Sequence, residues 1–162
     1  MTRSLSRIVG ASLIGVALVG MIAIAPASAA SPAAVAIVSP MTFNDDGFNF
    51  GTFEASGPAV DEGLICEAGT VDDTRIIFVG FQSNRGAQIP VRKTFTCDDG
   101  EIFIKIQVHL DFASSTESFS WVVLGGTGAY ANVRGSGLGT TTPDGSDPQT
   151  GNINTYTGFL LG

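Results

Sequence analysis

The chain has 162 residues, with 15 acidic and 8 basic side chains and a formal net charge of −7. This length fits one domain, and the acidic balance disfavours nucleic acid and anionic membrane surfaces as partners. With 1 histidine and 2 cysteines, the sequence predicts no metal site, and it contains no phosphate-loop or cofactor motif.

Residues 1–30 are predicted to be a signal peptide. Two arginines precede an apolar run over residues 8–25, and the small residues Ala-Ser-Ala at 27–29 form a cleavage site. The alternative is a membrane anchor, since the run is long enough to span a bilayer, but the cleavage site favours removal. We therefore expect a secreted, extracellular protein with a net charge of −9 after cleavage and no further contact with the membrane.

Short strands follow an N-terminal leader at residues 31–46, which the pattern leaves open as strand or linker. The barrel domain is predicted to cover residues 47–162. Its strands are predicted at residues 47–56, 62–71, 74–82, 89–97, 101–112, 118–124, 131–141 and 152–161. Eight strands at this spacing predict an all-β barrel or sandwich, and closure into a barrel removes exposed edges. The interior of such a barrel is either filled by side chains or holds one small ligand.

Cys66 and Cys97 predict one disulfide, because an even pair of cysteines in an exported protein is typically oxidised. They fall in the second and fourth predicted strands, which are not neighbours in a simple meander. Either the strands are misplaced there or the bond crosses one end of the barrel.

The predicted strand 101–112 has two distinct faces. One face is aliphatic and consists of Ile102, Ile104, Ile106, Val108 and Leu110. The other is mostly polar and consists of Phe103, Lys105, Gln107, His109 and Asp111. We favour the aliphatic row inside and the polar row in water. In the alternative, the polar row lines a pocket and the aliphatic row packs on a second subunit or sheet.

Acidic pairs lie at predicted strand ends. They are Asp45-Asp46, Asp61-Glu62, Asp72-Asp73 and Asp98-Asp99. None has the spacing of a calcium loop, so turn chemistry explains them most simply.

A glycine-rich turn follows the strand 118–124. Gly125, Gly126, Thr127 and Gly128 predict a tight reversal that tolerates little change. Glycine then recurs at every other position of the next strand over residues 135–139, which leaves one face bare for a large neighbour.

The motif Gly-Gly-Thr-Gly-Ala-Tyr, three residues, Arg-Gly-Ser-Gly at residues 125–137 resembles the signature of plant dirigent proteins and, more loosely, that of allene oxide cyclases. The resemblance implies a single eight-stranded antiparallel up-and-down barrel with a pocket inside, assembled as a homo-oligomer, a trimer. It also implies a small apolar ligand whose coupling or cyclisation is steered without a cofactor.

The resemblance places Arg134 in the pocket, where the family's arginine acts beside an aspartate. Gly128 and Ala129 stand where that aspartate is expected. The catalytic candidates are Arg134, His109 and Asp111. The ligand-binding candidates are Arg134, Lys105, Gln107, Glu54, Trp121 and Tyr130. From the residues alone, a surface His109–Asp111 pair and a structural Arg134 paired with a carboxylate are the simpler interpretations.

Two hypotheses follow. The first is a secreted barrel that binds a small apolar molecule and acts in a dirigent-like or cyclase-like way. The second is a non-enzymatic extracellular protein with a packed barrel whose surface contacts another protein or the cell envelope. A lumen of at least roughly 300 Å³ with polar groups among apolar ones would distinguish them in favour of the first.

Overall fold

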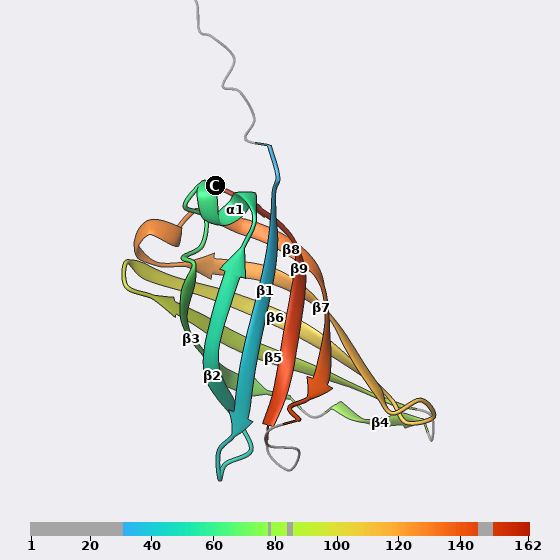
Figure 1. The fold of residues 1–162 in the computed structure, drawn as a ribbon. Helices are drawn as coiled ribbons and strands as arrows, with labels where there is room; N and C mark the ends of the chain where they lie inside the picture. Colours follow the sequence, from blue (N-terminus) through green and yellow to red (C-terminus); the bar gives the residue numbers. More distant parts are fainter. Residues whose placement is uncertain (1–30, 78, 84–85, 146–150) are drawn as a thin grey trace, which may run out of the picture.

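The computed structural model describes residues 31–162, apart from 78, 84–85 and 146–150, and the side chains of residues 78–85 are not described. The predicted signal peptide and its cleavage site lie outside this part. The described chain forms a closed antiparallel barrel of eight strands in up-and-down order (Figure 1). The barrel strands are β1 (Ala33–Phe43), β2 (Asn49–Ser56), β3 (Ala68–Ile76), β5 (Gly86–Cys97), β6 (Gly100–Asp111), β7 (Thr116–Gly126), β8 (Arg134–Pro143) and β9 (Gly151–Leu161).

Pairing between β3 and β5 closes the barrel. The short strand β4 (Val79–Ser83) lies outside this ring and pairs with β5 alone among the described strands. At one end of the barrel lie the short helix α1 (Pro58–Asp61) and the 3₁₀ turn η1 (Gly128–Tyr130), together with the start of β1 and the end of β9. We call this the closed end. The opposite end, where β1 turns into β2, β6 into β7 and β8 into β9, is the open end.

The expected leader is the first strand of the barrel. β1 pairs with β2 on one side and with β9 on the other, so the barrel domain begins before residue 47. Its inward positions, including Val35, Ile37 and Met41, are buried and alternate with exposed ones. This period-two pattern is that of a half-buried strand, and it settles the choice that the sequence left open.

The predicted strands 62–71 and 74–82 are wrong in their boundaries. Pro58 begins α1, whose Ala59 is fully buried, and a loop continues to the start of β3. One strand, β3, covers the end of the first predicted segment and the beginning of the second. The total of eight barrel strands is nevertheless correct, because β1 supplies the strand lost here.

The disulfide is confirmed between Cys66 and Cys97, whose Cα atoms lie 6.0 Å apart. Cys66 precedes β3 and Cys97 ends β5, and these two strands are neighbours with Thr70 opposite Thr96. The bond therefore joins adjacent strand ends at the closed end of the barrel, and the misplaced strands explain the apparent conflict with a meander.

The aliphatic row of β6 faces the interior, as favoured from the sequence. Ile102, Ile104, Ile106 and Val108 are all buried. On the next strand, Trp121 and Phe119 of β7 lie against the face of β8 that its glycines leave without side chains. A Cβ added to Gly137 would come within 2.6 Å of the Trp121 ring. The Trp121 indole N–H donates to the carbonyl oxygens of Leu138 and Thr157, each at 3.2 Å.

The core near the closed end is aromatic and nearly solid. The Phe95 ring meets Phe53 edge-on with centroids 5.0 Å apart, and it meets Tyr156 at 5.6 Å. Phe119 packs on Tyr156 at 4.8 Å. The void that Phe95 and Tyr156 border together with Trp121 and aliphatic side chains is about 20 Å³, too small for an organic ligand.

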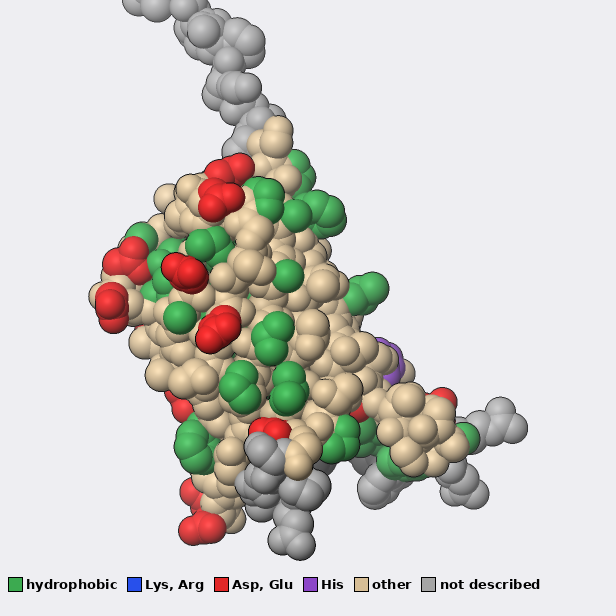
Figure 2. Space-filling view, in the orientation of Figure 1, with side chains coloured by type: hydrophobic (Ala, Val, Ile, Leu, Met, Phe, Trp, Pro, Cys, Tyr) green, Lys and Arg blue, Asp and Glu red, His purple; other side chains and the backbone are tan. Residues whose placement is uncertain are grey.

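The outer surface is consistent with the acidic composition. On the face shown in Figure 2, the described side chains include several Asp and Glu but no Lys or Arg. Among the described residues, no helix is long and apolar enough to cross a membrane.

Candidate functional site: a polar cavity at the open end of the barrel

A cavity of about 530 Å³ opens at the end of the barrel opposite α1. Its walls are apolar side chains from β5 and β6, and the rings of Phe43 and Phe112 line it as well. The wall residues are Val91, Ile106, Val108 and Leu110. Polar side chains from β2, β3, β5 and β9 line the same space, so the cavity combines an apolar wall with a polar one.

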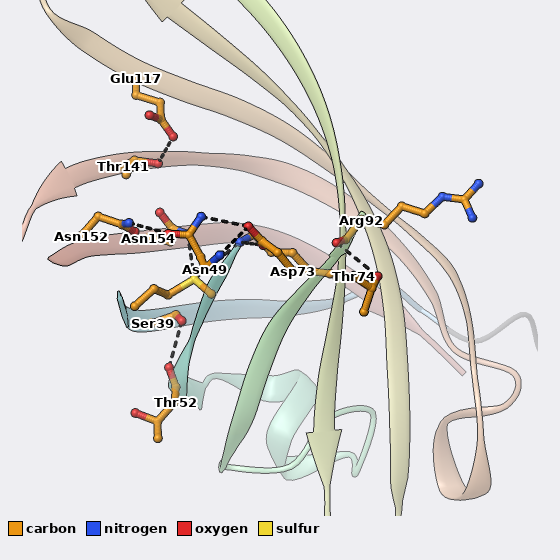
Figure 3. A network of polar contacts seen from close by, with 12 residues as sticks. Ser39, Asn49, Thr52, Asp73, Thr74, Arg92, Glu117, Thr141, Asn152 and Asn154 are labelled. Atoms are coloured by element: carbon orange, nitrogen blue, oxygen red, sulfur yellow. Dashed lines mark hydrogen bonds and ion pairs between the residues drawn. The ribbon is translucent and has the colours of Figure 1, made fainter. Parts of the chain in front are cut away.

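A buried ion pair lies in the polar wall. The ammonium of Lys93 on β5 contacts the carboxylate of Asp73 on β3, and the two residues are 2% and 8% exposed. Both occupy inward positions, since Lys93 lies between the buried Val91 and Phe95 along its strand. The neighbouring Arg92 points away from the polar network (Figure 3). An ion pair away from water is maintained only if both partners are present and hydrogen-bonded.

Two asparagines extend this pair in a chain of hydrogen bonds (Figure 3). The second oxygen of Asp73 accepts the backbone N–H of Asn49 at 3.1 Å and its side-chain N–H at 2.9 Å. The side-chain oxygen of Asn49 accepts in turn from Nδ2 of Asn152, also at 2.9 Å. The chain thus connects β5, β3, β2 and β9 around the open end.

Met41 of β1 completes the polar wall with a weak acceptor. Its sulfur lies 3.5 Å from Nζ of Lys93 and 3.1 Å from Nδ2 of Asn154. Beside it on β1, the buried Ser39 hydroxyl donates to the carbonyl of Thr52 at 2.9 Å. These contacts satisfy donors of the polar wall.

Some hydrogen-bond acceptors near the polar wall have no donor. Among the described residues, Oδ1 of Asn152, Oδ1 of Asn154 and the hydroxyl of Tyr156 are buried without a hydrogen-bond partner. The three residues alternate along the inward face of β9. Burial raises the pKa of Tyr156 far above its usual value, so this hydroxyl stays protonated. Buried polar groups are normally paired, so the open oxygens of Asn152 and Asn154, which line the cavity, indicate a place for water or a ligand.

Two carboxylates lie toward the rim of the cavity. Glu117 accepts a hydrogen bond from the Thr141 hydroxyl at 2.6 Å. Asp111 accepts from the backbone N–H groups of Ala113 at 2.8 Å and Ser114 at 3.4 Å. These bonds hold the pKa of Asp111 below its usual value, which keeps it ionised.

The structure does not gather the residues predicted for the site. Arg134 starts β8 at the closed end, is exposed, and donates to the carbonyl of Val133 at 2.9 Å. Asp111 is at the open end, so the structure does not bring the two together. The expectation that Arg134 points into the lumen is wrong, because the inward positions of β8 are its glycines.

The other candidates also lie away from the cavity, apart from Asp111, which lines it. Lys105, Gln107 and His109 belong to the outward row of β6, and Glu54 is exposed on β2. Trp121 is buried in the packed core.

Tyr130 is buried at the closed end, where its hydroxyl donates to Asp99 at 2.6 Å. Burial and the Asp99 carboxylate raise the pKa of Tyr130 to about 12. Tyr130 therefore has a structural role at this end, in line with the turn chemistry expected of the pair Asp98-Asp99.

Sequence reasoning missed the residues that do line the cavity. The sequence predicts a turn at the pair Asp72-Asp73, whereas the pair lies within β3 and Asp73 points inward. The signal was period-two alternation: Val71 and Asp73 share a face, as do Val91 and Lys93. Asn49, Asn152 and Asn154 could have been found in the same way, once the phase of each strand was known.

Across the described residues, no group of three or more His, Cys, Asp and Glu side chains is arranged to hold a metal ion. Comparison of the chain with models of protein families, with curated proteins and with solved structures gave no match. The resemblance to dirigent proteins and allene oxide cyclases therefore stays a prediction from the motif.

Proposed function

We propose that the protein binds a small, mainly apolar molecule in the cavity at the open end of its barrel. The observation that carries this proposal is the cavity itself, with about 530 Å³ of space, an apolar wall and a few convergent polar groups. Small-molecule sites typically have about 300–1,000 Å³ and this mixture of walls. The volume also exceeds the lumen that the binding hypothesis requires.

A pair of matched substitutions tests the proposal. Val108 lines the cavity from β6, whereas Val122 of β7 points outward and is 43% exposed. Val108→Trp should fill the cavity and weaken binding of an apolar probe such as 1-octanol by at least about tenfold, measured by titration calorimetry. Val122→Trp should leave binding unchanged. Equal affinity of both variants and the parent protein would contradict binding in this cavity.

A dirigent-like or cyclase-like reaction is a narrower form of this proposal. Such a reaction in the cavity would act beside Lys93 and Asp73 and not at Arg134, which lies outside the barrel. Arg134→Leu should therefore leave any turnover of a bound substrate unchanged, while a variant of Lys93 should alter it.

The outer surface supports a second candidate, contact with another protein, including the homotrimer that the resemblance implies. Leu138 and Phe159 are 67% and 56% exposed on the neighbouring strands β8 and β9. Exposed apolar groups of this kind are typical of interaction surfaces. Sedimentation velocity on the parent protein and on Leu138→Ser tests it, since a trimer held by this surface should dissociate in the variant.

Export is part of the proposal as well. The disulfide is compatible with an oxidising compartment. An intact mass of protein from the culture medium should lack residues 1–30, and a mass that retains them would contradict cleavage.

A further inference from the structure

The hydrogen-bond polarity of the cavity limits the ligands that it can hold, an inference that rests on the proposed binding function. The chain of side chains starts at Asp73, whose carboxylate, paired with Lys93, accepts hydrogen bonds and donates none. It accepts from Lys93 on one oxygen and from Asn49 on the other. The amide of Asn49 must therefore turn its nitrogen toward Asp73 and its oxygen away.

The orientation of Asn49 determines that of the next amide. Its outward oxygen accepts from Nδ2 of Asn152, which leaves Oδ1 of Asn152 open. Asn154 directs its Nδ2 to the sulfur of Met41, an acceptor that also takes a bond from Lys93, and so leaves its own Oδ1 open. Both open groups of the cavity lining are thus acceptors, and the orientation of Asn152 follows from the charge of Asp73. The hydroxyl of Tyr156 borders the small void of the packed half and does not line the cavity.

The two acceptors belong to the cavity. Asn152 and Asn154 line it, they are 9% and 4% exposed, and they are two positions apart on the inward face of β9. A buried acceptor left without a donor costs free energy, which a ligand with a donor recovers on binding. A ligand without one leaves both oxygens unpaired.

The charge of the cavity lining also limits the ligands, because it disfavours an anion. Its charged lining residues are Asp73, Asp111, Glu117 and Lys93, three carboxylates against one ammonium, so the formal charge of the lining is −2. The ammonium already contacts Asp73. An anionic ligand would meet net repulsion, with no free cation to receive it among the described lining residues.

From this we infer that the cavity takes an apolar molecule whose polar head is a neutral hydrogen-bond donor, such as a hydroxyl group, and that it rejects a carboxylate. The head lies against Asn152 and Asn154, and the apolar body lies against the aliphatic wall of β5 and β6.

A matched ligand series tests the inference. The probes are 1-octanol, heptyl methyl ether, which has the same number of heavy atoms but no donor, octanoate, and the hydrocarbon octane. Titration calorimetry at neutral pH should give an affinity for the alcohol about tenfold above that for the ether, because one hydrogen bond to a buried acceptor separates them. Octanoate should bind more weakly than the alcohol.

Substitution of the acceptors should remove the preference. In Asn154→Leu the ratio of alcohol to ether affinity should fall toward one, while binding of octane is kept or improved. Asn49→Leu should lower the ratio too, because the amide of Asn152 is then free to turn. Asn132→Leu is the control, since Asn132 is exposed beside η1, far from the cavity lining. Near-ultraviolet circular dichroism verifies that each variant is folded.

The outcomes separate the inference from the proposed function. If octane, ether and alcohol bind with equal affinity, the cavity is a binding site but the inference is overturned. If octanoate binds most tightly, the inference is also overturned, and Lys93 is available to an anion after all. If none of the four binds, the proposed function itself fails.

Discussion

The two halves of the barrel interior are built from the same strands but differ in content. Toward the closed end, Phe95 packs edge-on against Phe53 and Tyr156, and Phe95 and Tyr156 border a void of about 20 Å³. Toward the open end, Asp73 and Lys93 border a cavity of about 530 Å³. The change occurs within two residues of β5, between Phe95 and Lys93.

The contrast shows that the alternation of a strand determines which side chains face inward but not whether they pack closely. Aromatic side chains fill their half and contribute burial to stability. Buried carboxylate, ammonium and amide groups must be hydrogen-bonded, and that requirement fixes their positions. Here the paired groups border a space that no side chain fills. The closed end, with its disulfide and α1, is the packed half, and the open end holds the candidate site.

The largest expected effect comes from breaking the ion pair of the open half. Asp73→Ala leaves the ammonium of Lys93 buried without a carboxylate, which should lower the free energy of unfolding by about 3–5 kcal/mol. Phe95→Ala in the closed half should cost a similar amount, about 3–5 kcal/mol, through the cavity that it creates. Urea denaturation monitored by Trp121 fluorescence measures both.

The control for this prediction replaces both partners. Asp73→Leu combined with Lys93→Met should recover most of the lost stability, since a buried ion pair exchanged for apolar side chains is often neutral or stabilising. No comparable rescue is expected for Phe95→Ala. A double variant as unstable as Asp73→Ala would mean that the open half depends on its polar groups for folding.

The turn at the closed end should be the next most sensitive. A Cβ on Gly126 would lie 2.5 Å from the carbonyl oxygens of Glu101 and Tyr130, whereas one on Gly145 meets nothing within 4 Å. Gly126→Val should therefore lower the free energy of unfolding by about 1–3 kcal/mol through overpacking. Gly145→Val should be close to neutral. Equal melting temperatures would show that the turn is not crowded.

The raised pKa of Tyr130 predicts how the free energy of unfolding changes at alkaline pH. Its pKa is raised from 10.0 to about 12 in the folded protein, so above pH 10 the unfolded chain loses this proton before the folded one. The stabilisation is complete below pH 10 and declines as the pH rises toward 12, with a slope of up to about 1.4 kcal/mol per pH unit. Tyr130→Phe should reduce that slope in denaturation series between pH 9 and 12 by this amount. An unchanged slope would contradict the assignment.

The smallest effect is expected for Arg134. Because its side chain is exposed on the outside of β8, Arg134→Leu should change stability by less than about 0.5 kcal/mol and leave ligand affinity unchanged. Lys93→Met, in contrast, should alter affinity. A loss of binding in Arg134→Leu would restore the pocket role that the resemblance implies.

Local signals of the sequence were sufficient for an all-β barrel or sandwich, the disulfide and the sidedness of β6, whereas the closed up-and-down barrel was implied by the resemblance. The alternation of Ile102, Ile104 and Ile106 is strict, and Cys66 has one possible partner. The boundary of β3 was harder, since Asp72 and Asp73 are typical turn residues, and a strand tolerates a buried Asp73 only where Lys93 and Asn49 compensate.

The site was out of reach for a physical reason. The members of its polar wall come from β1, β2, β3, β5 and β9, and only the closure of the barrel by β3 and β5 brings Asp73 to Lys93. The glycine motif predicted a pocket role for Arg134 instead. The same motif also predicted a bare strand face, and that prediction is confirmed by Trp121 lying against Gly137.

The most direct test of the two-ended barrel is methyl NMR during titration with 1-octanol. Signals of Ile106 and Val108 at the cavity should shift with saturation, while those of Ile102 and Val123 in the packed half should stay in place. Shifts confined to Ile102 and Val123, or no shifts at saturating ligand, would contradict a binding site at the open end.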